Sequence, residues 1–409
     1  MPVGGQAYEK GMKSMNQLKK SNSDRPRTTK PVILVTGKAY SPHIGGIETV
    51  MQQVAEGFRK KAHISVLTCR DDMGLTQKEK LNGVRVTRCG SLGTVASCPI
   101  SFSYLSEFRR KVMVSDVVEL HLPFPLADLA LILSGYRGRV VVAWHSDVVR
   151  QKKLLRFYKP LMQKLLKRAD AILVATKGHI DSSPYLQPYR EKCVIVPYGL
   201  SVAEYDAVPK MPVLTAKLRD PAAKKILFVG RLVYYKGVDV LLEAFAKVQT
   251  ASELFLAGTG VLEESLMARA EALGISARVH FLGKRMTPEL RAAFADCDIF
   301  VLPSVANSEA FGIVQLEAMV YGKPVINTAL PTGVPLVSLD GETGITVPPS
   351  DADALAAAME TLLSDDTLRL AYGAAARKRV EETFAIERVL SDTWNVLVSD
   401  LWNRYPKKR

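Results

Sequence analysis

The sequence predicts an α/β protein built from two doubly wound domains. Apolar runs rich in β-branched residues alternate with segments of helical periodicity along most of the 409 residues. Continuous apolar strands separated by helices are typical of parallel sheets that helices cover on both faces. Residues 196–225 are rich in Pro and polar residues and contain no strong strand, so this segment predicts a domain boundary.

The predicted strands fall into two groups, one on each side of that segment. The first group is 31–37, 63–69, 84–88, 116–121, 139–145 and 171–176, and the second is 225–231, 253–259, 278–283, 298–304 and 323–328. We therefore expect domains at 31–205 and 206–381, after a disordered basic extension over 1–30. Ligands of open α/β sheets bind outside the carboxyl ends of the strands, so functional residues are expected just after each strand.

Composition excludes several classes of protein. The chain is 47% hydrophobic and 23% charged, as expected of a globular protein. Its N-terminus has no apolar signal-peptide core, and no run approaches the roughly 18 apolar residues of a membrane helix. Five cysteines without CxxC spacing predict neither a zinc site nor a disulfide framework. These observations predict a cytoplasmic protein.

The net charge of +14 is unevenly distributed. Residues 31–200 hold 25 basic and 13 acidic residues, whereas 201–403 hold 19 and 26. Arg150–Arg168 has eight basic residues, no acid and apolar residues at helical spacing, which predicts an amphipathic helix with a kink at Pro160. This helix is either a core helix with a solvated basic face or a peripheral helix on anionic lipid. Nucleic acid is not expected, because no aromatic interleaving or binding motif accompanies the charge.

Residues 307–318, NSEAFGIVQLEA, hold two acids eight positions apart, Glu309 and Glu317. Glycosidase carboxylates stand about 5–9.5 Å apart, whereas eight residues of helix rise by about 12 Å. Helical periodicity from Gly312 to Met319 instead places Glu309 in the turn before a helix and Glu317 in its second turn. Free N–H groups near Gly312 can then hold a phosphate between two acids that accept hydroxyl hydrogen bonds. The alternative is a capped helix with two solvated acids.

Three other strand ends carry candidate residues. Gly45 and Gly46 precede a helix, where they permit close approach of a ligand or only a tight turn; the Gly-Lys-Ser/Thr ending of a P-loop is absent. His145 follows a strand and faces the interdomain crevice, as a functional group or a structural hydrogen-bonder. Arg231 and Lys236 lie after the first strand of the second domain, where two cations can neutralise a diphosphate.

Taken together, these residues resemble a known family. Gly45-Gly46, His145, GRLVYYKG (230–237) and Glu309-x7-Glu317 with AFGI inside it are similar to the retaining, two-domain (GT-B) glycosyltransferases of family 4. The resemblance runs from residue 31 to about 400 and implies two Rossmann-like domains facing across a cleft. TKGHIDSSPYL and HLPFPLADL resemble bacterial enzymes that build O-antigen or exopolysaccharide, many of them mannosyltransferases.

The resemblance implies a role for each candidate residue. Glu309 would contact hydroxyls of the donor sugar, the backbone at Phe311, Gly312 and Ile313 would meet the phosphates, and Glu317 would take the ribose hydroxyls. Arg231 and Lys236 would stabilise the leaving diphosphate. Gly45 and Gly46 would allow close approach of the acceptor-side loop, and His145 would contact the donor sugar.

The implied reaction is transfer of a hexose with retention of configuration, without a metal, because no DxD-like metal motif appears where one would be needed. The expected donor is GDP-mannose, with UDP-glucose, UDP-galactose or UDP-N-acetylglucosamine as alternatives, since nothing in residues 327–337, expected beside the nucleobase, separates guanine from uracil. The expected acceptor is a lipid-linked glycan of O-antigen, exopolysaccharide or lipopolysaccharide synthesis.

Two further expectations concern location and architecture. The basic first domain and the Arg150–Arg168 helix would face the anionic inner leaflet, which predicts a cytoplasmic enzyme held peripherally at the membrane. The last helix, within 382–409, would cross back to the first domain, as in relatives. A nucleotide-sugar epimerase of the same architecture and a non-catalytic sugar-nucleotide sensor are the alternatives from other classes.

Overall fold

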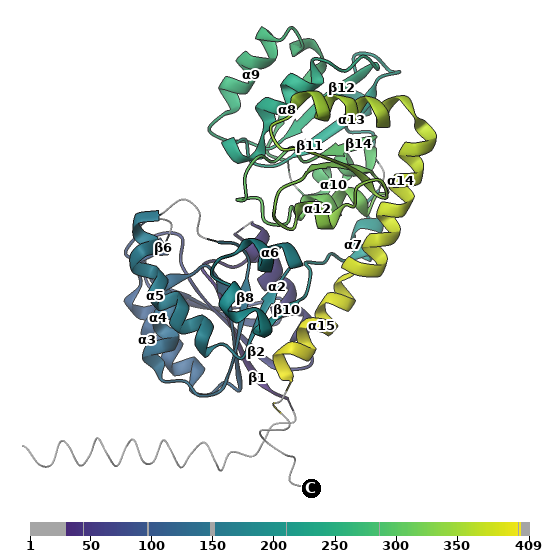
Figure 1. Ribbon diagram of the computed structural model, residues 1–409. Helices are drawn as coiled ribbons and strands as arrows, with labels where there is room; N and C mark the ends of the chain where they lie inside the picture. The colour runs from purple at the N-terminus through teal and green to yellow at the C-terminus, as the bar shows by residue number, and fades with distance from the viewer. Residues whose placement is uncertain are drawn as a thin grey trace, which may run out of the picture.

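The structure is a computed structural model that describes residues 30–43, 45–95, 98–147, 152–209, 211–285, 287–399 and 401, without the side chains of 152–154. The predicted disordered extension therefore lies outside the described residues, apart from Lys30. Two domains stand one above the other, each a sheet between helices (Figure 1). This architecture confirms the predicted fold class.

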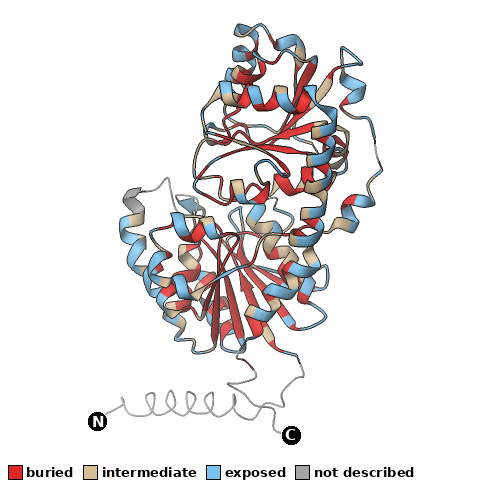
Figure 2. Cartoon of the chain, turned by 45° about the vertical axis from the view of Figure 1, so that its right-hand side comes forward, coloured by how far each residue is buried: buried red, intermediate tan, exposed pale blue. Residues whose placement is uncertain are grey.

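The N-terminal domain contains an eight-stranded sheet of order β10-β9-β8-β7-β1-β2-β4-β3, parallel except between β3 and β4. Its central strands are buried on both faces, as Figure 2 shows. The strands are β1 (Val32–Thr36), β2 (His63–Cys69), β3 (Gln77–Leu81), β4 (Val84–Cys89), β7 (Val117–Leu122), β8 (Arg139–Trp144), β9 (Ala171–Val174) and β10 (Cys193–Ile195); β5 (Thr94–Val95) and β6 (Cys98–Pro99) form a separate ladder.

Helices cover both faces of this sheet. One face carries α3 (Phe102–Val112), α4 (Pro125–Ser134) and α5 (Lys152–Arg168), and the other carries α2 (Gly46–Phe58) together with the last helix of the chain. The shorter elements are α6 (Lys177–Ser182) and a 3-10 turn, η1 (Gln187–Lys192).

The predicted amphipathic helix is α5, and it continues through Pro160. Met162, Leu165 and Leu166 are buried in the core beneath it, whereas Phe157 is 82% exposed. Core packing thus accounts for the apolar residues of its second half, and Phe157 projects into solvent.

The C-terminal domain contains a six-stranded, fully parallel sheet of order β13-β12-β11-β14-β15-β16. The strands are β11 (Lys224–Val229), β12 (Ser252–Ala257), β13 (Val279–Gly283), β14 (Ile299–Val301), β15 (Val325–Thr328) and β16 (Gly344–Val347). The helices are α8 (Val238–Phe245), α9 (Glu263–Ala272), α10 (Thr287–Asp296), α11 (Val314–Met319), α12 (Val334–Val337), α13 (Ala352–Ser364) and α14 (Asp366–Arg379), with 3-10 turns η3 (Tyr234–Lys236) and η4 (Ser276–Arg278).

The chain crosses between the domains twice, and the two crossings lie side by side. The first runs through α7 (Val202–Asp206) and η2 (Thr215–Lys217), and the second through a π-helical turn (Val380–Phe384) into α15 (Ile386–Val398). The N–H of Leu200 donates to the carbonyl of Phe384 at 3.0 Å, and the N–H of Ile386 donates back to Leu200 at 2.9 Å.

The last helix packs on the N-terminal domain, where Figure 1 shows it in yellow beside the strands of the lower sheet. Val389 and Leu397 join the core on the α2 face, and the ring of Trp394 lies 5.1 Å from that of Phe58. Within the described part of the chain, no helix combines the length and apolarity needed to span a membrane.

Candidate functional site

Neighbouring strands bring the two key loops of the C-terminal domain together. β11 and β14 are parallel neighbours, so the loops after their carboxyl ends meet. Gly237 has φ +63°, and a Cβ there would lie 2.1 Å from the carbonyl oxygen of Pro303, so only glycine allows this packing. The N–H of Val305 then donates to the carbonyl of Tyr235 at 2.9 Å. This contact fixes the lysine that precedes Gly237.

Lys236 and Glu309 form a buried ion pair at this junction. The Nζ atom lies 2.5 Å from Oε2, and the two side chains are 9% and 11% exposed. The hydroxyl of buried Ser304 donates to the same carboxylate oxygen at 3.1 Å. Glu309 is therefore not a solvated acid, contrary to the capped-helix alternative.

Gly312 makes the turn after Glu309, with φ +72°. A Cβ at this position would lie 2.5 Å from Cδ2 of Leu302, so the conformation and the space both require glycine. In the described part of the chain, the N–H groups of Phe311, Gly312 and Ile313 donate to no other residue. Three backbone donors thus lie free for an anion beside the Lys236–Glu309 pair.

Glu317 lies in the first turn of α11, because the helix begins two residues later than predicted. Its carboxylate is half-buried and accepts a hydrogen bond from the hydroxyl of Tyr205 at 2.8 Å. Burial raises the pKa of Glu317, while Tyr205 and Arg291 oppose that shift. Among described residues its second oxygen has no hydrogen-bond partner, which leaves one acceptor for a ligand hydroxyl.

Arg231 lies at the mouth of the same site. Its guanidinium is exposed and donates to the hydroxyl of Tyr235 at 3.0 Å. The Nζ of Lys236 lies 5.7 Å from the centroid of the same ring. The two predicted cations are therefore brought together around one tyrosine.

The glycine pair lies at the start of α2, where the N-terminal domain meets the C-terminal domain. Gly46 is the first residue of α2, and Gly45 precedes it in extended conformation. A Cβ on Gly46 would lie 3.3 Å from Cδ1 of Ile313, so the start of α2 faces the turn at Gly312 directly. The structure thus brings Gly46 to the turn at Gly312, with Gly45 directly before it in the chain.

His145 follows β8 but does not present a free ring nitrogen. Its Nδ1 is hydrogen-bonded to the hydroxyl of Tyr198 at 2.7 Å and its Nε2 to Nδ1 of His121 at 2.9 Å. Burial, reinforced by His121, lowers the pKa of this 5% exposed ring well below its usual range. A donor hydroxyl can reach a ring nitrogen only by displacing Tyr198 or His121. The ring of Tyr198 packs on Phe311 at 4.8 Å and so links the histidine to the turn at Gly312.

A buried acid, Glu119, lies beside His121. Oε1 of Glu119 is 3.6 Å from Nε2 of His121. Burial raises the pKa of Glu119 to about 8 and lowers that of His121 to about 3. Both residues border a cavity of about 30 Å³, the size of a single water molecule. His145 and Tyr198 line the same cavity.

Sequence reasoning missed the residues that support the predicted site: Glu119, His121, Tyr198, Tyr205 and Ser304. A signal existed for the first two, because they alternate along the predicted strand 116–121 and end it. Tyr198 and Tyr205 lie in the predicted linker, where no periodicity marks them. In the described part of the chain, no group of three His, Cys, Asp or Glu side chains could hold a metal ion.

Two protein-family models match the chain, one in each domain. Residues 215–379 match the model described as "Glycosyl transferases group 1", and 45–199 match "Glycosyl transferase 4-like domain". The chain is 32% identical to O-antigen chain mannosyltransferase C of Escherichia coli, over 88% of this chain and 95% of that protein. It is 35% identical to D-rhamnosyltransferase WbpZ of Pseudomonas aeruginosa, over 85% and 90%.

Solved structures share the fold at low sequence identity. HepE of Anabaena in complex with UDP-glucose superimposes with a TM-score of 0.74 at 18% identity, over 90% of this chain and all of that one. WaaG, a glycosyltransferase of lipopolysaccharide biosynthesis, gives 0.64 at 18% identity, over the same shares. Sequence relatives and fold agree, and the chain belongs to the two-domain (GT-B) glycosyltransferases of family 4.

Proposed function

We propose that this enzyme transfers mannose from GDP-mannose, with retention of configuration, to a lipid-linked glycan during synthesis of a surface polysaccharide. The observation that carries the proposal is the Lys236–Glu309 pair beside the three free N–H groups of the Gly312 turn. A relative named as an O-antigen mannosyltransferase supports the choice of sugar and pathway.

The site fits a sugar diphosphate because it offers separate partners to each part of it. The diphosphate would take the Gly312 turn and the two cations, while a sugar hydroxyl would donate to Glu309. Donor binding would then exchange the Lys236–Glu309 contact for a charge-assisted hydrogen bond on each side chain. Glu317 would accept from the ribose with the oxygen that Tyr205 leaves free.

The chemistry follows from where charge develops. When the bond between the sugar C1 and the phosphate oxygen breaks, negative charge grows on the diphosphate, and Lys236, Arg231 and the backbone donors stabilise it. The acceptor hydroxyl attacks C1 from the same face, and its proton passes to the departing phosphate. Neutral His145 would contact the sugar at Nδ1, in competition with Tyr198.

The donor nucleotide is tested first, by calorimetric titration with GDP and with UDP. Tight binding of GDP that is lost in Glu317→Ala supports a guanosine donor and its ribose contact. A preference for UDP moves the proposal to glucose, galactose or N-acetylglucosamine. A transfer assay with the preferred nucleotide sugars and lipid-linked acceptors then identifies the sugar, and NMR of the product reads the anomeric configuration.

We also infer that turnover needs no metal and that the enzyme works at the anionic inner face of the membrane. Positive charge in the N-terminal domain and exposed Phe157 on α5 support the membrane contact. Full activity in excess EDTA tests the first inference. Co-sedimentation with anionic vesicles that weakens with added salt tests the second.

A further inference from the structure

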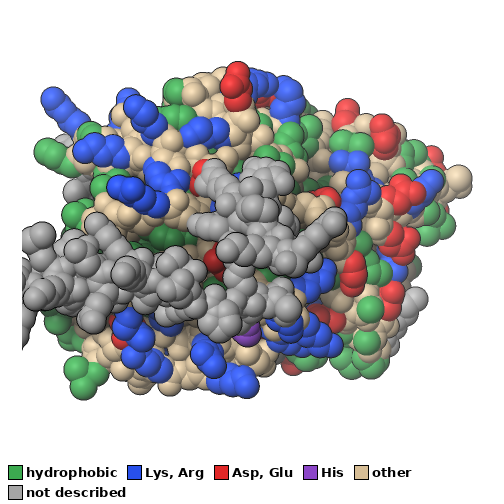
Figure 3. Space-filling model, turned by 90° about the horizontal axis from the view of Figure 1, so that it is seen from below, with side chains coloured by type: hydrophobic (Ala, Val, Ile, Leu, Met, Phe, Trp, Pro, Cys, Tyr) green, Lys and Arg blue, Asp and Glu red, His purple; other side chains and the backbone are tan. Residues whose placement is uncertain are grey.

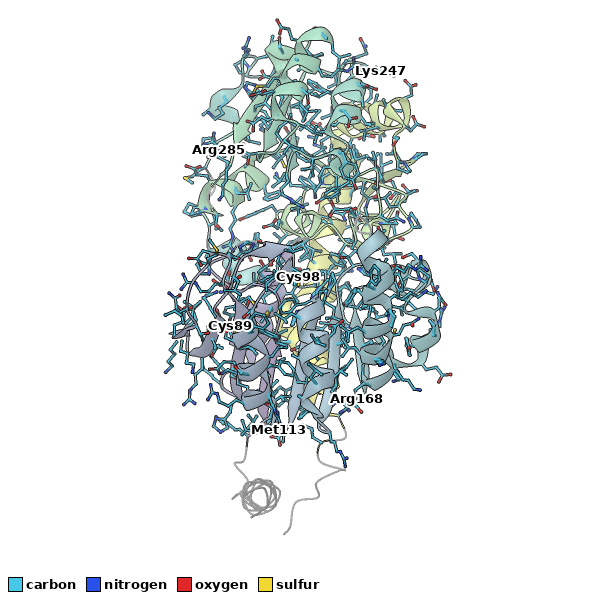
Figure 4. The ribbon with its side chains drawn as sticks, turned by 90° about the vertical axis from the view of Figure 1, so that its left-hand side faces the viewer. Cys89, Cys98, Met113, Arg168, Lys247 and Arg285 are labelled. Carbon is cyan, nitrogen blue, oxygen red and sulfur yellow. The ribbon has the colours of Figure 1, made fainter. Side chains whose placement is uncertain are left out.

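A second hollow lies at the opposite end of the N-terminal sheet from the donor site. It has a volume of about 490 Å³ and is formed by the amino ends of β1, β2 and β4 with the carboxyl ends of α2 and α3. Met113, which follows α3, lies at this lower edge of the molecule in Figure 4. Strand β1 separates the two ends by about 16 Å, at about 3.3 Å for each of its five residues. We call this hollow the amino-edge groove.

Basic side chains line the amino-edge groove. They are Arg59, Lys80, Arg85, Arg110 and Lys111, and no Asp or Glu is among the lining residues. They come from the consecutive strands β3 and β4, from α3 and from the residue that follows α2. Lys and Arg side chains gather on this end of the molecule when it is seen from below (Figure 3).

Lys80 and Arg85 are the least compensated of these cations. They are directly opposite each other in the antiparallel pairing of β3 and β4, an arrangement in which like charges destabilise the sheet. The neighbouring strand residues differ: Arg88 pairs with Glu79 at 2.6 Å, and Lys78 pairs with Glu107 at 2.9 Å. In the described part of the chain, the side chains of Lys80 and Arg85 have no ion-pair or hydrogen-bond partner.

The cations at the helix ends add further positive charge to the amino-edge groove. Arg59 donates to the carbonyl of Glu56 at the end of its own helix, and Arg110 pairs with Glu107. Lys111 is half-buried, and burial followed by repulsion from Arg110 lowers its pKa. Helix ends explain the presence of Arg59, Arg110 and Lys111, because cations stabilise helix carboxyl ends. They do not explain two strand cations set face to face.

We propose that the amino-edge groove binds a phosphate-bearing anion at a site separate from the donor site. Guanidinium and ammonium groups that converge from several elements match the oxygens of a phosphate, and the volume admits more than one phosphoryl group. The ligand is either a free polyphosphate-type anion or the headgroup of an anionic lipid. Binding would relieve the repulsion between Lys80 and Arg85.

Titration with inorganic tripolyphosphate tests the site in the full chain. The variant Lys80→Gln/Arg85→Gln should bind at least tenfold more weakly. The control Lys217→Gln/Arg219→Gln removes the same charge from exposed positions outside the N-terminal domain and should change affinity less than twofold. Tripolyphosphate can also enter the donor site, so the titrations are repeated in Lys236→Ala, where the groove component should persist.

Co-sedimentation with vesicles of phosphatidylcholine, with and without phosphatidylglycerol, distinguishes the two sources. Loss of anionic-vesicle binding in the groove variant alone assigns a lipid headgroup, whereas unchanged vesicle binding with weakened tripolyphosphate binding assigns a free anion. Equal effects of the two double variants on both probes, or no binding of either probe by the wild type, overturn the proposal. Unfolding midpoints of all variants show that the comparison concerns folded protein.

Discussion

The ammonium of Lys236 and the carboxylate of Glu309 lie 2.5 Å apart, where neither side chain is more than about a tenth exposed. Each charge is therefore the other's main compensation in the free enzyme. Truncation of one leaves the other buried without its partner, which typically costs about 3–5 kcal/mol of stability. A loss of activity at either position must be separated from a loss of folded protein.

Replacement of Lys236 by Ala should lower turnover by about 10²–10³-fold, because one donor aimed at developing negative charge contributes about 2.7–4 kcal/mol. The measurement is kcat at saturating donor, corrected for the folded fraction. The double variant Lys236→Met/Glu309→Gln is the control, since it leaves no unpaired buried charge. It should recover stability relative to Lys236→Ala without recovering turnover; a normal rate in either variant removes Lys236 from the reaction.

Replacement of Glu309 by Gln should reduce turnover far more than nucleotide affinity. Its proposed partner is the sugar, and the nucleotide contacts of Glu317 and the Gly312 turn remain in place. Paired measurements of kcat and of the Kd for the nucleotide diphosphate check this expectation. A parallel loss in both quantities would place Glu309 on the nucleotide instead of the sugar.

The fold could be predicted because buried parallel strands are continuous apolar runs. All eleven predicted runs overlap a strand, whereas β3, β10, β16 and the two-residue strands β5 and β6 were missed. β3 reads QKEKL and is an exposed edge strand, so its sequence carries no apolar signal. Two of the three residues of β10 are exposed and the middle two residues of β16 are only partly buried, so neither strand forms a buried apolar run.

The candidate site could be predicted only where a residue follows a strand. Lys236 and Glu309 follow neighbouring strands, and strand order then brings them together. The bond between Tyr205 and Glu317 joins residues 112 positions apart across the linker, and no local pattern encodes it. The two bonds that occupy His145 also depend on tertiary packing, so the sequence left a functional and a structural histidine equally open, and the structure has a buried ring with both nitrogens hydrogen-bonded.

Replacement of Gly312 by Ala should weaken diphosphate binding and lower stability. The new Cβ would meet Leu302 at 2.5 Å in a left-handed conformation, so the turn must shift and its N–H groups move away from the phosphate. Gly341→Ala is the matched control, because Gly341 has φ +70° and open space around its Cβ position. In chemical denaturation, the free energy of unfolding should fall by about 1–3 kcal/mol more in Gly312→Ala than in Gly341→Ala. This difference measures the cost of the steric clash with Leu302. Equal losses in both variants, with nucleotide affinity retained, would contradict the role of this turn.

Stability should fall between pH 6.5 and 8 because of Glu119. Burial raises the pKa of this acid from 4.5 to about 8, so in this range the folded state holds a proton that the unfolded state has released. The folded state binds more protons, and the free energy of unfolding therefore decreases as pH rises, by about 1.4 kcal/mol per pH unit for one proton. Below pH 6.5 the opposite effect of His121, whose pKa burial lowers from 6.5 to about 3, offsets this trend.

The variant Glu119→Gln removes the titrating carboxyl and should become more stable than the wild type as pH rises through this window. The difference between the two should grow by up to about 2 kcal/mol from pH 6.5 to 8, since one proton is involved over about 1.5 pH units. Urea denaturation at several pH values measures it. Glu191→Gln, at an exposed position of the same domain, should follow the wild-type curve. A constant offset between Glu119→Gln and the wild type would show that Glu119 does not exchange its proton in this range.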